Sequence, residues 1–165
     1  MRDGEAPTVS IRPATAADVP VVLQFTRDLA EYERRRHEVV ATEERLHRTL
    51  FGPRPAAEVL IAEEHGEPVG LALFFSTYST FLGQAGIYLE DLFVQPRARG
   101  RGVGRQLLAK VAQLAIERDY GRLEWSVLTW NEPAIKFYES LGARPQDEWA
   151  VYRLAGVELQ NLAGP

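Results

Sequence analysis

A glycine-rich segment in the second half of the chain has the composition of an anion-binding turn. It reads Arg99-Gly100-Arg101-Gly102-Val103-Gly104, follows an apolar strand-like run and precedes an amphipathic helical pattern. Glycine at alternate positions is costly for a regular backbone, so its presence indicates an unusual conformation or a close neighbour. Free N–H groups and the positive end of a helix suit a phosphate group.

The common nucleotide-binding signatures do not fit this segment. It differs from the dinucleotide pattern G-x-G-x-x-G, and no G-K-[ST] follows as in a nucleoside triphosphate loop. The alternative is a flexible loop with incidental glycines, which three alternate glycines beside a helix start make less favoured. The arginines are weak support, because Lys110 and Lys136 are the only lysines among 19 basic residues. We therefore expect a phosphate-bearing ligand other than a dinucleotide or a nucleoside triphosphate.

Two adjacent carboxylates could move a proton. Glu90 and Asp91 lie in the apolar run 87–94, and neighbouring residues of a strand point to opposite faces of a sheet. We therefore expect only one of them to reach a given site. A carboxylate buried at the end of an apolar strand has a raised pKa and is a better base at neutral pH. The alternative is a structural pair of carboxylates held in salt bridges.

Tyr138 is a phenol within an apolar helical pattern. A phenol has a reference pKa of about 10, which suits a donor to a group whose pKa lies in the same general range. Tyr138 also belongs to an i, i+3, i+4, i+7 stripe with Ala134, Phe137 and Leu141. Such a stripe is typical of core packing, and periodicity alone favours that role.

Alternating strands and helices are predicted to position these groups. Apolar periodicity predicts strands at 9–12, 58–63, 68–78, 87–94, 123–128 and 150–154. Helices are predicted from the Thr15–Asp18 capping box to about residue 33, from Thr42 to near residue 51, at 102–120, and at 133–141 before Gly142. The His65-Gly66 turn makes a hairpin, which requires antiparallel pairing, whereas the unit 87–128 requires a right-handed parallel crossover. The sheet should therefore be mixed, with residues 79–86 as a loop.

Composition is typical of one globular domain. The chain has 165 residues, of which 45% are hydrophobic and 25% charged, as in ordinary soluble proteins. We expect residues 1–8 to be a flexible N-terminus and residues 9–165 to form a single domain. The net charge of −4 gives no reason to expect a nucleic-acid partner. The N-terminal residues lack the apolar core of a signal peptide, so we expect a cytoplasmic protein.

Neither a membrane span nor a metal site is expected. The longest apolar run, Val69 to Phe75, is far too short to cross a bilayer. Cysteine is absent, which excludes disulfides, thiolate nucleophiles and cysteine-based metal sites. The three histidines, His37, His47 and His65, lie far apart in the sequence without metal-ligand spacing.

The sequence resembles a known family at four places. Residues 99–104 match the R/Q-x-x-G-x-G/A acetyl-CoA signature of the GNAT N-acetyltransferase superfamily. The stretches IRPATAAD (11–18), YLEDLFV (88–94) and WNEPAIKFY (130–138) are similar to its diamine branch, the spermidine/spermine and thialysine acetyltransferases. The resemblance runs from about residue 9 to residue 158 in the same order. It implies an α/β (α+β) fold with a mixed, mostly antiparallel sheet, one parallel strand–helix–strand unit and flanking helices.

The resemblance implies an acetyl-CoA site along one strand and the turn that follows it. In the family, the CoA pyrophosphate lies on N–H groups matching Gly100 to Arg105, and the pantetheine arm pairs with the strand matching Leu92 to Val94. The implied contacts are Leu92, Phe93, Val94, Arg99, Gly100, Arg101, Gly102, Val103, Gly104, Arg105, Asn131, Ala134 and Tyr138. Asn131 could instead only cap the helix that begins near Pro133. Acetyl-CoA would be the co-substrate, with no metal.

The resemblance also implies two separate proton transfers. Glu90 matches the residue thought to accept the amine proton through water, and Tyr138 matches the tyrosine beside the CoA sulfur. The amine must lose a proton, because only about one part in a thousand of a lysine-like amine is neutral at pH 7. The oxyanion formed during transfer needs an N–H donor, and the departing thiolate needs a proton, which Tyr138 would supply.

The resemblance gives less information about the residues that bind the acceptor amine. The substrate-contacting residues of the branch correspond to Tyr32, Glu33, Glu90, Glu124, Trp125 and Ser126. Two departures weaken a match to spermidine. The basic run 34–36 follows Glu33 at once, and residues 79–81, Ser-Thr-Phe, stand where diamine acetyltransferases have Asp-Pro-Trp. The acidic contact of that loop is lost.

The sequence therefore predicts an N-acetyltransferase that acts on a primary amine of a small molecule, such as a polyamine, thialysine or an amino acid. One alternative is an acetyltransferase for protein N-termini or lysines. Another is a catalytically silent CoA-binding regulatory module, which the presence of both Glu90 and Tyr138 makes less favoured. The resemblance alone implies a homodimer with its acceptor sites near the subunit interface.

Overall fold

A five-stranded sheet is the centre of the first part of the chain. The computed structural model describes residues 9–164, and the strands lie in the order β1-β2-β3-β4-β5. Their bounds are Val9–Pro13, Glu58–Glu64, Glu67–Ser79, Gln84–Val94 and Leu123–Trp125. Neighbouring strands are antiparallel except β4 and β5, which run parallel. The predicted mixed, mostly antiparallel sheet is confirmed.

Within residues 9–164, the helices α1 to α4 lie at the places in the sequence where helices were predicted, and a further helix, α5, was not predicted. The α-helices are α1 (Val19–Tyr32), α2 (Glu43–Phe51), α3 (Val103–Glu117), α4 (Glu132–Ser140) and α5 (Gly156–Ala163). Three short 3-10 turns, η1 (Ala16–Asp18), η2 (Arg36–Glu38) and η3 (Pro96–Ala98), connect them to the strands. Thr42 caps α2 by accepting a hydrogen bond from the N–H of Arg45 at 3.2 Å, as predicted.

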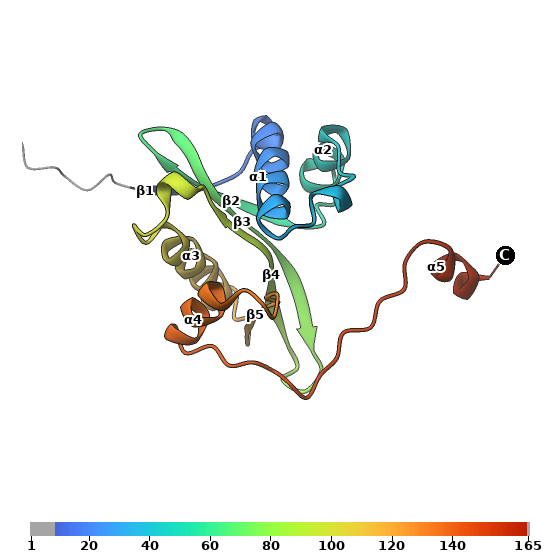
Figure 1. Cartoon of the computed structure of the whole chain (residues 1–165). Helices are drawn as coiled ribbons and strands as arrows, with labels where there is room; N and C mark the ends of the chain where they lie inside the picture. Colours follow the sequence, from blue (N-terminus) through green and yellow to red (C-terminus); the bar gives the residue numbers. More distant parts are fainter. Residues whose placement is uncertain (1–8, 165) are drawn as a thin grey trace, which may run out of the picture. The chain divides into compact units, whose positions relative to one another are not determined.

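The first three helices cover the sheet on both faces (Figure 1), with α1 and α2 on one face and α3 on the other. On the first face, the rings of Phe25 of α1 and Phe93 of β4 lie 5.3 Å apart. On the second face, Gly70 of β3 pairs with Val94, and a Cβ on Gly70 would lie 3.4 Å from the side chain of Leu107 of α3. Because strand residues alternate between faces, adjacent residues of β4 line two separate layers.

The chain falls into two compact units, Met1–Ser126 and Val127–Pro165, of which the structure describes residues 9–126 and 127–164. The first unit contains the sheet with α1, α2 and α3, and the second contains α4 and α5. Residues 1–8, predicted to be a flexible N-terminus, lie outside the described part of the chain.

Several boundaries differ from the sequence-based prediction. The loop between β3 and β4 spans only residues 80–83, because pairing continues to Ser79 opposite Gln84. The helix α3 ends at Glu117 rather than near residue 120, and Asp119 adopts the left-handed φ of 56° that ends helical geometry. The strand β5 has only three residues, so the pattern at 123–128 overestimated its length.

The strand predicted at 150–154 was wrong. Those residues have no regular structure in the described chain, and the helix α5 follows them. Trp149, Val151 and Tyr152 are exposed. A strand needs a neighbour that satisfies its N–H and C=O groups, and an alternating sequence does not show whether such a neighbour exists. The helix α5 was missed because it is short and begins at Ala155, which provides no side-chain cap.

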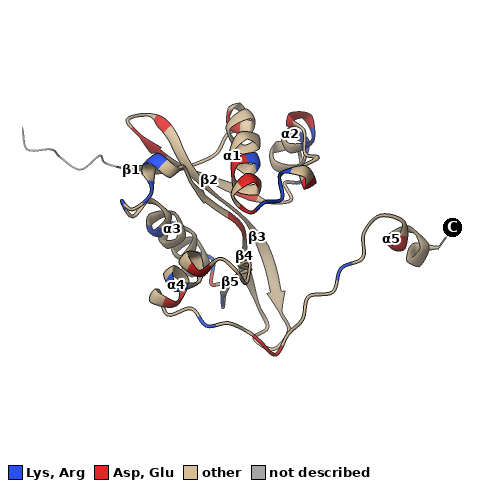
Figure 2. Cartoon of the chain, in the orientation of Figure 1, with Lys and Arg blue, Asp and Glu red and all other residues tan. Residues whose placement is uncertain are grey.

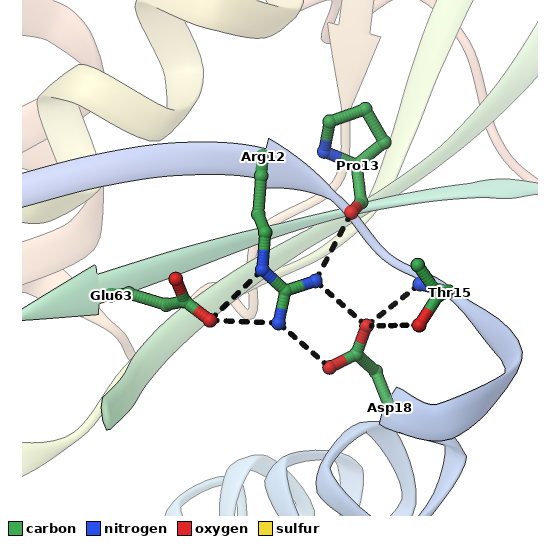
Figure 3. A network of polar contacts seen from close by, with 5 residues as sticks. All are labelled: Arg12, Pro13, Thr15, Asp18 and Glu63. Carbon is green, nitrogen blue, oxygen red and sulfur yellow. Dashed lines mark hydrogen bonds and ion pairs between the residues drawn. The ribbon is translucent and has the colours of Figure 1, made fainter. Parts of the chain in front are cut away.

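Arg12 of β1 joins the start of α1 to β2 (Figure 3). Its two terminal nitrogens donate to the carboxylate of Asp18 at 2.8 and 2.9 Å, and its Nε donates to Glu63 at 2.9 Å. Asp18 also accepts from the N–H of Thr15 at 2.7 Å, which confirms the predicted capping box. The hydrogen bond from Arg12 lowers the pKa of Asp18 to about 2. Asp18 is therefore ionised at neutral pH and fixes the entry into α1.

Candidate active site

The glycine-rich turn has the backbone geometry that its composition predicted. Gly100 and Gly102 have left-handed φ angles of 75° and 80°, which residues with a Cβ rarely adopt. Gly102 is the N-cap of α3, and a Cβ on either glycine would meet no atom within 4 Å. The first N–H groups of a helix have no partner within the helix. The turn therefore offers free donors and open space beside them.

Three arginines of the turn are held by the protein itself. The Nε of Arg97 donates to the side chain of Gln95 at 2.8 Å, and Arg101 donates to Glu64 at 2.8 Å. The Nε of Arg99 donates to the carbonyl of Val94 at 2.9 Å. These contacts hold the three side chains in place around the turn. The cofactor contacts that the resemblance implies for Arg99 and Arg101 stay a prediction.

Arg99 also connects the turn to the end of α1. Its guanidinium carbon lies 5.2 Å from the centroid of the Tyr32 ring, within the range of a cation–π contact. Tyr32 is one of the two α1 residues that the resemblance assigned to the substrate. The structure thus brings the predicted phosphate-binding turn and one predicted acceptor-side residue together in the first unit.

β4 is interrupted by a bulge at Glu90. Asp91 pairs with Leu73 of β3, and the next pair joins Leu89 to Phe74, so Glu90 has no residue opposite it. Strict alternation of side chains is lost in a bulge, and the expectation that Glu90 and Asp91 point to opposite faces does not apply here. Glu90 is exposed and Asp91 is half-buried. The more buried of the two carboxylates is therefore Asp91 and not Glu90.

Three carboxylates cluster at this bulge. Burial, together with the nearby charges of Glu90 and Glu33, raises the pKa of Asp91 to about 6. Burial also raises the pKa of Glu33, against the opposing effect of Arg35. Figure 2 shows acidic residues side by side on β4 and at the C-terminal end of α1. The cluster can hold a cation, and Asp91 can accept a proton near neutral pH.

β5 completes the predicted acceptor side within the first unit. Ser126, just after β5, makes a 2.5 Å hydrogen bond with the hydroxyl of Tyr88 on β4. Glu124 is paired with Arg122 at 2.8 Å, and Trp125 is half-buried. Glu124 is thus already compensated by an arginine, which leaves the carboxylates at the bulge as the stronger site for a cation.

The remaining predicted site residues belong to the second unit. Asn131 is buried and caps α4 by accepting a hydrogen bond from the N–H of Ala134 at 3.4 Å, so the capping role is confirmed. Tyr138 is half-buried on α4, and its ring lies 5.3 Å from that of Phe137. The phenol therefore sits on a partly covered helix face.

Neither a group of metal ligands nor a membrane-spanning helix is found in the described part of the chain. Among residues 9–164, no three His, Asp or Glu side chains are grouped as metal ligands would be. Within the same range, no helix combines the length and apolar character needed to cross a bilayer.

The sequence analysis did not identify Glu64, which binds Arg101 of the glycine turn. A glutamate that precedes a hairpin turn is ordinarily exposed, so its sequence position gives no signal of this role.

Comparisons with known proteins identify the family. Residues 24–143 match the acetyltransferase (GNAT) family. A thialysine N-epsilon-acetyltransferase from Sus scrofa is 38% identical over 95% of this chain and 98% of its own length. The chain belongs to the GNAT family. An L-ornithine N5-acetyltransferase from Arabidopsis thaliana is 34% identical over 92% of this chain and 86% of its own length, so the GNAT relationship covers nearly the whole protein.

Solved GNAT-like structures agree with the fold. An integron cassette protein from the mobile metagenome of V. cholerae has a TM-score of 0.80 and 29% identity, and the match covers 98% of this chain and all of that one. Membership of the GNAT family makes the protein an N-acetyltransferase and implies acetyl-CoA as co-substrate. The open space at Gly100 and Gly102 fits the pyrophosphate of that group.

Proposed function

We propose that the protein transfers an acetyl group from acetyl-CoA to a primary amine of a small molecule. The observation that carries this proposal is the acidic cluster of Glu33, Glu90 and Asp91 on β4 and α1, in the same unit as the glycine turn. A cluster of carboxylates favours an acceptor with a positive charge beside the reacting amine. Relatives named for thialysine and ornithine, both of which carry two amines, support this class of acceptor.

The cofactor site lies along β4 and the start of α3. Acetyl-CoA, when bound, supplies the thioester carbonyl that the amine attacks. The N–H groups of residues 100–105 would hold the pyrophosphate, and the backbone of Leu92 to Val94 would bind the pantetheine arm, with Asn131 and Ala134 of α4 as further contacts. These assignments are what the resemblance of the sequence motifs to the family implies.

The chain's own side chains handle two protons. Glu90, or Asp91 beside it, accepts the amine proton at a carboxylate oxygen, directly or through water. Asp91 is a specific second candidate because its raised pKa, about 6, suits a base at neutral pH. Tyr138 of α4 donates its phenolic proton to the leaving thiolate. Tyr32 and Ser126 line the acceptor side.

An amine panel tests the proposal. The purified protein is given acetyl-CoA with thialysine, ornithine, lysine, spermidine and a monoamine of similar length, and the release of free CoA thiol is followed. The chain has no cysteine, so a thiol-reactive reagent reacts only with the free CoA that the reaction releases and not with the protein. We expect acceptors with two charged nitrogens to give the highest kcat/KM. Turnover only with peptides would indicate a protein acetyltransferase, and CoA binding without turnover would indicate a silent regulatory module.

Assembly and location belong to the same proposal. We expect a cytoplasmic homodimer, as the resemblance to diamine acetyltransferases implies. The exposed side chains of Trp149, Val151 and Tyr152 support association, because large apolar groups close together on a surface favour contact with a partner.

A further inference from the structure

Glu64, the last residue of β2, is a buried carboxylate that depends on one arginine. Its side chain is 5% exposed, and its Oε2 accepts a hydrogen bond from Nη2 of Arg101 at 2.8 Å. Its Oε1 is buried and has no hydrogen-bond partner within the described chain. A buried charge is strongly destabilising unless it is paired. The ion pair with Arg101 therefore holds Arg101 in place as firmly as it holds Glu64.

Arg101 lies at the centre of the glycine turn. It stands between Gly100 and Gly102, whose left-handed backbone is not supported by any side chain of their own. The Nη2 atom that binds Glu64 also donates to the carbonyl of Arg97 at 3.1 Å. One guanidinium thus ties the turn to itself and to β2. Glycine loses more conformational freedom on ordering than any other residue, so this tether orders the turn in advance.

We propose that Glu64 is a positioning residue for the pyrophosphate site and acts through Arg101. This inference rests on the proposed function, because it requires acetyl-CoA to bind at the turn. A turn that is ordered before binding loses less entropy when the ligand arrives, and its affinity is correspondingly higher. Arg101 then serves as a tether rather than as a phosphate ligand. Arg105, in the first turn of α3, is exposed and is the arginine we assign to direct phosphate contact.

The test compares two acetyl donors. Acetyl-CoA carries the pyrophosphate, whereas S-acetylpantetheine lacks it but presents the same thioester. For Glu64→Gln, we expect KM for acetyl-CoA to rise roughly fivefold or more, with kcat and KM for S-acetylpantetheine little changed. Glu58→Gln is the matched control, because Glu58 lies at the other end of β2 and pairs with Arg118 at 2.6 Å. That variant should leave both donors unaffected.

Other results would overturn the inference. Equal losses with both donors would mean that Glu64 only supports the fold, and no loss with acetyl-CoA would mean that the tether does not serve binding. If Glu64→Gln is insoluble, Arg101→Lys is tested instead, and its KM for acetyl-CoA should rise more than its KM for S-acetylpantetheine. If S-acetylpantetheine turns over too slowly, the Kd for CoA from calorimetry decides, and it should rise for Glu64→Gln but not for Glu58→Gln. Wild-type protein that fails to bind CoA would contradict the proposed function instead.

Discussion

Single side chains at the bulge of β4 set the chemistry that the site can perform. Asp91 has a pKa of about 6 because it is buried beside Glu90 and Glu33. A cationic amine bound next to these groups would favour their charged forms and lower the pKa of Asp91 again. The same carboxylates are therefore suited first to attract the amine and then to take its proton.

The phenol of Tyr138 is expected to act only in the chemical step. Tyr138→Phe retains the ring and its packing against Phe137 but removes the proton donor. We expect kcat to fall roughly a hundredfold, with little change in CoA affinity or Tm. Steady-state kinetics and calorimetry measure the three quantities. Tyr120→Phe, which removes a hydroxyl bonded to Ser76, is the matched control. Equal kcat values for the Tyr138 and Tyr120 variants would restrict Tyr138 to packing.

Glu90 is expected to matter most where the amine is protonated. Glu90→Gln should depress kcat/KM most strongly near neutral pH and recover part of the loss at high pH, where solvent removes the amine proton unaided. A pH–rate profile of the variant against wild type measures this. Two profiles that run parallel would take the base role away from Glu90 and leave Asp91 or a water chain as the candidate.

Asp91 should lower the stability of the protein at neutral pH. Its folded-state pKa, about 6, lies above the ordinary aspartate value of 3.8, so its ionisation favours the unfolded chain. Its contribution to stability is complete below about pH 4 and is lost as the pH rises through 6. Asp91→Asn should therefore raise the free energy of unfolding by about 2 to 3 kcal/mol at pH 8 and hardly change it near pH 4. Urea titrations at both pH values check this, and a pH-independent difference would contradict it.

At the scale of elements, the site depends on a strand that bends and a helix that starts in the left-handed region. The bulge of β4 places Glu90 outside the ladder, and Gly102 begins α3 with open space around it. Both features interrupt regular structure at positions where a ligand can approach. β4 and α3 are therefore irregular at the residues that line the candidate site.

Gly102→Val should weaken CoA binding beyond its effect on stability. A Cβ at a left-handed position costs about 1 to 2 kcal/mol, and the larger side chain also fills the space beside the turn. We expect the Kd for CoA to rise about tenfold or more, measured by calorimetry on protein whose fold is checked by circular dichroism. Gly83→Val is the control, since Gly83 has a φ of 64° and equally open surroundings and lies before β4, at the opposite end of that strand from the glycine turn. Similar CoA affinity in both variants would remove the turn from the cofactor site.

Local constraints could be predicted from the sequence, and long-range ones could not. The Thr15–Asp18 cap follows from residues a few positions apart and was predicted. For the glycine-rich turn the sequence indicated an unusual conformation or a close neighbour, and Gly100 and Gly102 have the unusual, left-handed conformation. The bulge at Glu90 depends on the pairing of β3 with β4. The apolar periodicity of one strand does not predict such a bulge. The pair of Glu64 with Arg101 joins residues 37 positions apart. Either partner alone is an ordinary surface charge.

At the scale of the whole molecule, the proposed homodimer can be tested at the exposed apolar side chains near the C-terminus. Trp149, Val151 and Tyr152 are 75%, 85% and 94% exposed. Light scattering at micromolar concentration should give twice the 18.5 kDa mass of one chain. Val151→Asp with Tyr152→Asp should shift the mass toward that of the monomer, because a charge cannot be buried in an apolar contact without a partner. A wild-type mass near 18.5 kDa would contradict the proposed dimer.

The adjacent glutamates at the end of β2 have a consequence for folding itself. Glu63 binds Arg12 on one side of the strand, and Glu64 binds Arg101 on the other. A slip of β2 by one residue would turn its side chains to the wrong faces. In either direction, one arginine would still meet a glutamate while the other met Ala62 or His65. Every such misalignment leaves one pair broken, so the two glutamates select the correct alignment of β2 against β1 and the glycine turn before any ligand is present.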